Sequence, residues 1–323
     1  MLYGVLDGCL VAALQVFLQE TLYGMVLSFY LMEMGTTHRA AAFLDKGGTG
    51  KTTTVAHLGV ALSELGADVL LIDLAGKQGD LAKHFGVWET YQQQIADDEA
   101  WPNISTVFDD SWSTIADKLG ADPVGDLIIE TDEEVDLIPA HPGLDTLDAT
   151  LGNIDDPQDR YSRFEQFLDT YVDPLGYDIV LIDLPGLTNN VSYNGLWAAR
   201  HVITPVEMGP FEAKQAQALT ADLQKINDQF GIDVTLTLVL PNKVDTRTTL
   251  AETYLNDFET TYPTAIAPAA IPQSQDIRNA AQRGQTVFSY ANPSKTAEQA
   301  REAYTTAADA LWTRLKEAPN VQH

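Results

Sequence analysis

One glycine-rich segment limits the fold of this chain more than any other feature of its sequence. It reads FLDKGGTGKTTT at residues 43–54, between a predicted strand at 39–44 and a predicted helix at 51–65. Glycines let a backbone wrap closely around an anion, and a following helix adds free N–H groups and its positive dipole end. The lysine and the threonine hydroxyl suit the phosphates of a nucleotide and its Mg²⁺. The residues predicted to bind the nucleotide here are Gly47, Gly48, Thr49, Gly50, Lys51, Thr52 and Thr53.

Short apolar strands alternate with helical patterns along the chain. The runs at 68–73 and 178–183 are almost continuously apolar, which is typical of strands covered on both faces. This alternation predicts an α/β fold with a mostly parallel sheet and helices on both faces. We expect a single domain over 35–318 and a short tail at 319–323. Further strands are predicted at 135–139, 201–206, 234–240 and 265–271, further helices at 160–172, 211–230 and 296–315, and peripheral helices and loops at 87–130.

The loop departs from the usual phosphate-binding pattern at its first position. A strict GxxxxGK[ST] pattern needs a glycine where this chain has Asp45, and the loop instead reads KGGxGK[ST] with an extra lysine, Lys46. With this loop, residues from about 39 to 315 resemble the ParA/MinD group of deviant Walker A ATPases, and ParA/Soj-type partition ATPases in particular. The resemblance implies a three-layer P-loop NTPase fold, with ATP and Mg²⁺ as cofactors. It also implies an ATP-dependent homodimer in which Lys46 reaches the partner's nucleotide.

Two aspartates end the two most apolar strands. An unpaired carboxylate is costly at the end of a buried strand, and Mg²⁺ beside a phosphate site gives Asp73 and Asp183 a reason to be there. The resemblance assigns Lys46, Lys51 and Asp73 to catalysis and Thr52, Asp73 and Asp183 to the metal. Relatives carry a second aspartate where this chain has Ala75, and one residue is inserted after it. Asp80 or Gln78 is then left to orient the attacking water, and slow, partner-stimulated hydrolysis is expected.

Two later segments resemble the adenine side of the family's site. Asn242 follows a predicted strand and is expected to hydrogen-bond the adenine, and Pro272 is expected to pack on the base. Asn and Pro at strand ends are also common turn formers, so a structural role is the alternative. The tetrapeptide NKVD at 242–245 resembles the guanine signature of GTPases, but the glycine-rich loop KGGTGKTT at 46–53 favours an ATPase.

The chain's C-terminus bears on which member of the group it resembles. MinD-type relatives carry a basic amphipathic membrane helix, whereas this chain ends WTRLKEAPNVQH, with Pro319 and no basic cluster. We therefore expect a cytoplasmic ParA-type ATPase for partitioning plasmid or chromosomal DNA, with a ParB-like partner and no membrane contact. The alternatives are a nucleotide-gated scaffold with little hydrolysis and a MinD-like ATPase that positions a cellular cargo. Non-specific DNA is a candidate partner. The candidate contacts to its phosphates are Arg247, Arg278, Arg283, Lys295 and Arg301. The alternative is that these residues only form solvated helix faces.

Charge and cysteine content exclude several other classes. The formal net charge is −27, from 19 basic and 46 acidic residues, which argues against a basic nucleic-acid module or a polybasic anchor. Acidity on this scale favours a halophilic protein, because about 1 M salt shortens the Debye length to about 3 Å. The single cysteine, Cys9, excludes a disulfide framework and an all-cysteine zinc or iron–sulfur site within one chain.

The first 34 residues differ from the rest of the chain. They contain no Lys or Arg, and their two uncharged runs, 8–19 and 21–32, are too short to span a bilayer singly. Three explanations stay open: a start codon assigned too early, with Met32 or Met34 as the true start, a membrane-associated helix, or an extra helix of the fold.

Overall fold

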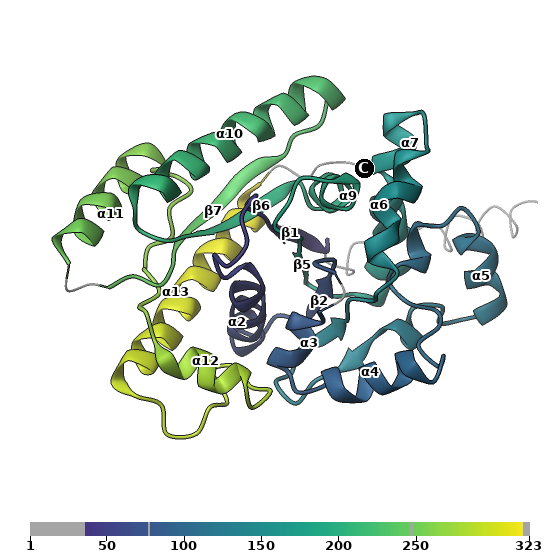
Figure 1. Ribbon diagram of the computed structural model, residues 1–323, viewed down its shortest axis with the longest axis horizontal. Helices are drawn as coiled ribbons and strands as arrows, with labels where there is room; N and C mark the ends of the chain where they lie inside the picture. The colour runs from purple at the N-terminus through teal and green to yellow at the C-terminus, as the bar shows by residue number, and fades with distance from the viewer. Residues whose placement is uncertain (1–35, 77, 246–247, 319–323) are drawn as a thin grey trace, which may run out of the picture. The chain divides into compact units, whose positions relative to one another are not determined.

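The strands of the described chain form one seven-stranded sheet (Figure 1). The computed structural model describes residues 36–76, 78–245 and 248–318. All neighbouring strands pair in parallel except the first two in spatial order, which are antiparallel. The spatial order is β3 (Ile129–Glu130), β4 (Asp136–Ile138), β2 (Val69–Asp73), β5 (Ile179–Asp183), β1 (His38–Ala42), β6 (His201–Val206) and β7 (Thr235–Pro241).

Helices cover both faces of this sheet. The helices α2 (Lys51–Glu64) and α13 (Lys295–Glu317) pack on one face, and α9 (Asn190–Ala199) and α10 (Pro210–Phe230) pack on the other. The other helices of the described ranges are α3 (Asp80–His84), α4 (Trp88–Ala96), α5 (Trp112–Leu119), α6 (Leu144–Gly152), α7 (Pro157–Tyr161), α8 (Arg163–Phe167), α11 (Thr249–Thr261) and α12 (Gln275–Ala281).

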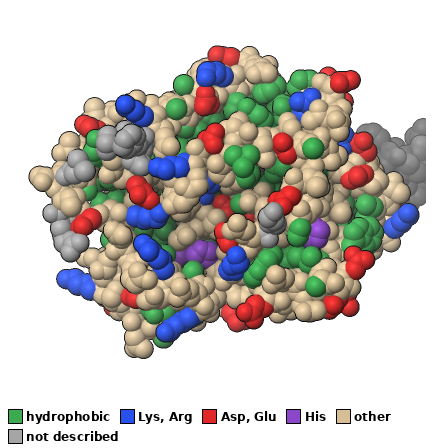
Figure 2. Space-filling view, viewed as in Figure 1, with side chains coloured by type: hydrophobic (Ala, Val, Ile, Leu, Met, Phe, Trp, Pro, Cys, Tyr) green, Lys and Arg blue, Asp and Glu red, His purple; other side chains and the backbone are tan. Residues whose placement is uncertain are grey.

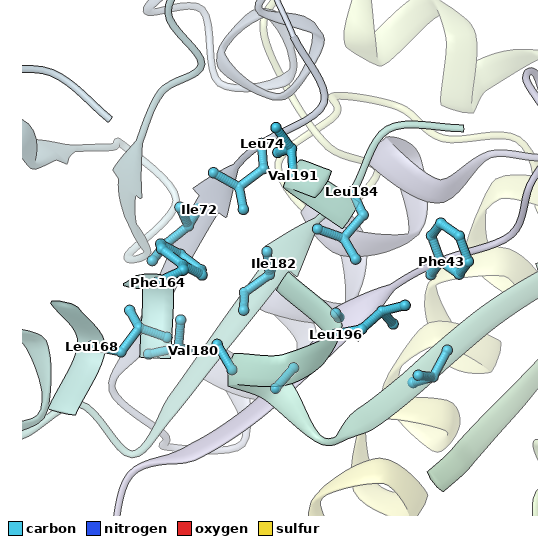
Figure 3. Packing of buried hydrophobic residues seen from close by; sticks show 14 of the residues in the cluster. Phe43, Ile72, Leu74, Phe164, Leu168, Val180, Ile182, Leu184, Val191 and Leu196 are labelled. Carbon is cyan, nitrogen blue, oxygen red and sulfur yellow. The ribbon is translucent and has the colours of Figure 1, made fainter. Parts of the chain in front are cut away.

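Two apolar cores separate the three layers. Side chains alternate across a strand, so neighbours on β2 and β5 enter different cores. Ile72 lies beside Phe164 of α8, and Ile182 and Leu196 of α9 belong to the same core (Figure 3). On the opposite face, the core contains Tyr304 of α13. The predicted three-layer α/β fold with a mostly parallel sheet is therefore confirmed.

One predicted strand is wrong, and one predicted helix is interrupted. Residues 265–271 form no strand, and only isolated bridges join Ile266 to Val239 and Pro272 to Val244. Prolines at 268 and 272 lack the N–H that a continuous ladder needs. The helix expected over 160–172 is instead split into α7, α8 and a π-helical turn at Leu168–Val172.

Several elements of the described ranges were not predicted, among them α9 and β3. The helix α9 has a weak apolar pattern, but its N-cap was a usable signal, because the Asn189 side chain accepts a hydrogen bond from the Ser192 N–H. The edge strand β3 is only two residues long. The explanations for residues 1–34, the tail at 319–323 and Arg247 lie outside the described residues. Within the described ranges, no helix has the length and apolarity needed to cross a bilayer.

Candidate nucleotide-binding site

The glycine-rich loop connects β1 to α2 at the carboxyl edge of the sheet. Gly48 and Gly50 have φ of +79° and +95°, in the left-handed region that L side chains rarely adopt. The N–H groups of residues 47–50 make no backbone hydrogen bond within the described part of the chain. Lys51 opens α2, whose first turn adds further free donors. The loop is therefore a cradle of N–H groups suited to phosphate.

The ammonium of Lys51 is held under this cradle. Its Nζ donates to the carbonyl oxygens of Leu44 at 3.1 Å and of Lys46 at 2.8 Å. The side chain is buried, and burial lowers the pKa of Lys51, while the charges of Asp183 and Asp45 oppose that shift. A buried cation placed against phosphate-binding N–H groups attracts a phosphate more strongly than an exposed one does.

Asp73 and Asp183 lie side by side beside the loop. They are paired in register at the ends of the neighbouring strands β2 and β5, and they are 1% and 0% exposed. The carboxylate of Asp73 accepts from the N–H of Ala75 at 2.8 Å and of Leu81 at 3.4 Å. Within the described residues, neither oxygen of Asp183 has a hydrogen-bond partner of normal geometry.

Burial dominates the electrostatics of this pair. It raises the pKa of Asp73 to about 7, against the opposing backbone hydrogen bonds. Burial also raises the pKa of Asp183 well above its usual value, and the neighbouring Asp73 raises it further. The Thr52 hydroxyl and the Lys51 ammonium act in the opposite direction. Two buried carboxylates with so little compensation either keep a proton or are both ionised beside a bound cation.

The donor set fits Mg²⁺ held mainly by phosphates and water. The described ranges contain no cluster of three or more His, Cys, Asp and Glu that could hold a metal. Mg²⁺ commonly takes one or two carboxylates plus substrate phosphates and keeps several waters. Thr52, Asp73 and Asp183 are the residues that would hold it, as the sequence predicts.

A cavity of about 610 Å³ opens at the loop. The backbone of Gly186 closes in on the loop, since a Cβ there would lie 2.9 Å from the Lys46 oxygen and 3.0 Å from Lys51 Nζ. The segment after β5 therefore reaches the phosphate position. The cavity is lined by Gly47, Gly48, Gly50, Lys51, Thr52, Thr53, Ala75, Asp80, Lys83, His84, Leu184, Gly186, Lys243, Ala281 and Gln282.

The structure brings most of the predicted residues together, although their roles stay predictions. Thr49 is buried within the loop, and Lys46 is half-buried at its start. Asn242 and Pro272 are not among the lining residues of the cavity. The Asn242 amide bonds to the loop itself, donating to the Thr49 oxygen at 2.9 Å.

Sequence reasoning missed several lining residues, among them the polar residues His84, Lys243 and Gln282. His84 lies on α3, with Nε2 3.4 Å from the Thr53 hydroxyl, and burial lowers its pKa to about 4, so it is neutral at physiological pH. Lys243 was visible only as part of the NKVD tetrapeptide. Gln282 follows α12 and had no local signal, because the chain's distant segments converge here only after folding.

Comparisons with known proteins agree with this geometry. A family model described as an AAA domain (AAA_31) matches residues 39–236. The chromosome partitioning protein ParA of Caulobacter vibrioides is 27% identical over 248 residues, which cover 76% of this chain and 84% of that protein. The chromosome-partitioning ATPase Soj of Thermus thermophilus is 26% identical over 280 residues, which cover 87% and 97%.

A solved structure extends the likeness. The cobyrinic acid a,c-diamide synthase of Mycobacterium smegmatis, solved with a bound ATP analogue and magnesium, is 26% identical, with a TM-score of 0.64. The match covers 87% of this chain and 96% of that one. Together with the cradle, the buried aspartate pair and the parallel sheet, these matches show that the chain belongs to the ParA/Soj/MinD family of P-loop ATPases.

Proposed function

We propose that this protein is an Mg²⁺-dependent ATPase of the ParA type, which acts in the cytoplasm in partitioning plasmid or chromosomal DNA. The observation that carries the proposal is the buried, register-matched pair of Asp73 and Asp183 beside a lysine-bearing phosphate loop. The named roles of the ParA and Soj relatives support the partitioning task.

The chain's own groups divide the work of binding a triphosphate. The loop N–H groups bind the phosphate oxygens, and Lys51 offsets their charge from a buried position. Mg²⁺, when bound, neutralises charge on the phosphates, and Asp73, Asp183 and Thr52 hold it. Gly186 approaches the loop closely enough for the segment after β5 to sense the terminal phosphate.

Turnover depends on a group that orients water. Ala75 lines the cavity and its side chain supplies no acceptor, although the family resemblance implies an aspartate at this position. Asp80 also lines the cavity, and its charge is near enough to add to the rise in the pKa of both buried aspartates that burial causes. Its Oδ1 is 2.8 Å from the ammonium of Lys83. We assign the orienting role to Asp80.

Phosphate release at saturating MgATP, in high salt with DNA present, tests this assignment. Replacing Asp80 with asparagine is expected to lower kcat about tenfold or more, because a carboxylate is lost from the water position. Ala75→Asp is expected to raise kcat about tenfold by restoring the missing acceptor. A wild-type rate no greater than that of Lys51→Ala would instead favour the alternative, a nucleotide-gated scaffold.

Dimerisation is the second part of the proposal. Lys46 stands at the start of the loop, and its main-chain oxygen already accepts from Lys51. The family resemblance gives its side chain a role on the partner's nucleotide. With a non-hydrolysable ATP analogue, light scattering should show twice the monomer mass for the wild type and the monomer mass for Lys46→Ala. A dimer of unchanged affinity in that variant would contradict the role.

DNA binding rests on an exposed basic surface. Figure 2 shows Lys and Arg side chains over the region of α12 and α13, whereas acidic groups are common over α4 to α7. Arg278, Arg283, Lys295 and Arg301 are all exposed there, although Arg301 already pairs with Glu64 at 2.8 Å. Exposed phosphate contacts weaken steeply with salt, so such binding should be measured across salt concentrations.

A further inference from the structure

The end of β7 is joined directly to the phosphate loop. The N–H of Asn242 donates to the Val206 oxygen at 2.7 Å, which fixes this residue to the end of β6. Its side-chain Nδ2 donates to the Thr49 oxygen at 2.9 Å, and its Oδ1 accepts from the N–H of Lys243 at 2.9 Å. With 3% of its surface exposed, Asn242 uses both ends of its amide inside the protein.

Lys243 holds the neighbouring peptide of the same loop. Its Nζ donates to the Gly48 oxygen and lies 2.8 Å from a carboxylate oxygen of Glu207. Its own φ is +53°, a left-handed conformation that costs a non-glycine residue about 1 kcal/mol. Such a conformation persists where its surroundings determine it, and here two contacts of the side chain do so.

These contacts act on two consecutive carbonyl groups. The Gly48 oxygen accepts from the Lys243 ammonium, and the Thr49 oxygen accepts from the Asn242 amide. Peptide N–H and C=O groups point in opposite directions, so fixing these two carbonyls also fixes the direction of the N–H group that follows each of them. The fit is close, because a Cβ on Gly50 would lie 2.5 Å from Asn242 Nδ2.

We propose that Asn242 and Lys243 are positioning residues that hold the phosphate loop in its phosphate-accepting shape through the carbonyls of Thr49 and Gly48. This inference rests on the proposed function, because it takes the loop as the phosphate site. It differs from the adenine contact that the family resemblance implies for Asn242. If the residue has a positioning role, replacing it weakens binding of the phosphates. If it contacts the adenine, replacing it weakens binding of the base.

The chain offers a matched control for each residue. Asn227 on α10 also donates its amide to a backbone oxygen, that of Val234 at 3.0 Å, and accepts from the Val234 N–H at 2.8 Å. Lys225 also pairs with an acid at 2.8 Å, Asp222. Neither control residue lines the cavity at the loop.

The test compares dissociation constants of the full chain for an ATP analogue, ADP and adenosine. Asn242→Ala and Lys243→Met are each expected to weaken the ATP analogue and ADP about tenfold and to leave adenosine unchanged. Lys243→Arg should recover most of the loss, and Asn227→Ala and Lys225→Met should bind like the wild type. Equal losses for adenosine, or no loss for ADP in the two test variants, would overturn the inference.

Hydrogen exchange separates this inference from the proposed function. In the nucleotide-free protein, amides of residues 47–50 are expected to exchange faster in Asn242→Ala and Lys243→Met than in Asn227→Ala. Unchanged exchange would overturn the inference even if the wild type binds ATP. If the wild type binds no nucleotide but the amides of the two test variants still exchange faster, the proposed function alone would be refuted.

Discussion

Replacing Lys51 with alanine should remove most of the protein's affinity for ATP and ADP. Lys51 is 7% exposed, its ammonium donates to two loop carbonyls, and the charge of Asp183 favours its protonated form. A charge-assisted contact with phosphate at such a site contributes about 3 kcal/mol to binding. Its loss should therefore raise the Kd by about 100-fold. Equilibrium titration with a fluorescent ADP measures the change.

Lys225→Ala provides the control for this experiment, because it also removes one lysine but from an exposed pair on α10. Thermal unfolding of both variants checks that each is folded. If Lys51→Ala bound ADP within threefold of the wild type while folded, the loop would not be the phosphate site.

Asp183→Asn should make the nucleotide-free protein more stable while abolishing Mg²⁺-dependent turnover. The wild-type carboxylate is fully buried, lacks a partner of normal hydrogen-bond geometry among the described residues, and adjoins a second carboxylate in register. An asparagine there removes one of two like charges and can donate to Asp73. We expect a gain of about 1–3 kcal/mol in the free energy of unfolding at pH 8, measured with urea.

The gain should depend on pH with a definite sign. The pKa of Asp73 is about 7 in the folded protein against an ordinary value of 3.8. Between these values the folded state keeps a proton that the unfolded state has lost, so wild-type stability falls as pH rises from about 4 to about 7. The advantage of Asp183→Asn should therefore be larger at pH 8 than at pH 5. A variant less stable than the wild type at pH 8 would contradict the assigned cost of the pair.

Magnesium with ADP should reverse that order of stability. A ligand that binds only the folded state stabilises it in proportion to its affinity, and the two carboxylates are the groups expected to hold the metal. Mg²⁺ with ADP should therefore raise the melting temperature of the wild type more than that of Asp183→Asn. This reversal distinguishes a metal site from a carboxylate pair that is merely unfavourable.

Local patterns were sufficient to predict the loop and most of the sheet. A glycine-rich turn between a strand and a helix needs only neighbouring residues to be recognised. The apolar runs that end at Asp73 and Asp183 predicted buried parallel strands, and carboxyl ends of parallel strands meet at one edge of a sheet. Their pairing in register is a fact of the folded sheet, because the two residues lie on separate strands far apart in the sequence.

The errors arose where distant parts of the chain decide the outcome. Prolines at 268 and 272 interrupt a segment whose composition is otherwise suited to a strand. Sequence patterns also missed a contact of Asn242, whose amide donates to Thr49, a residue 193 positions earlier in the chain. Only the packing of β7 beside β6 and the loop makes that contact, so no local pattern predicts it.

The acidic composition affects the parts of the site differently. Salt screens exposed charges over short distances but screens buried ones much less. Lys51 is buried and is shielded in this way, whereas the basic residues near α12 are exposed. Nucleotide binding should therefore persist in strong salt that weakens contacts to DNA phosphates. A net charge of −27 is then compatible with a phosphate-binding loop.

A crystal structure of the full chain with Mg²⁺ and a non-hydrolysable ATP analogue tests the central claim most directly. The account predicts phosphate oxygens within hydrogen-bond distance of the N–H groups of residues 47–53, with Lys51 Nζ on the terminal phosphates. It predicts the metal at the Thr52 hydroxyl, with Asp73 and Asp183 bound directly or through water. A nucleotide bound elsewhere, or bound here with the metal remote from both aspartates, would contradict it.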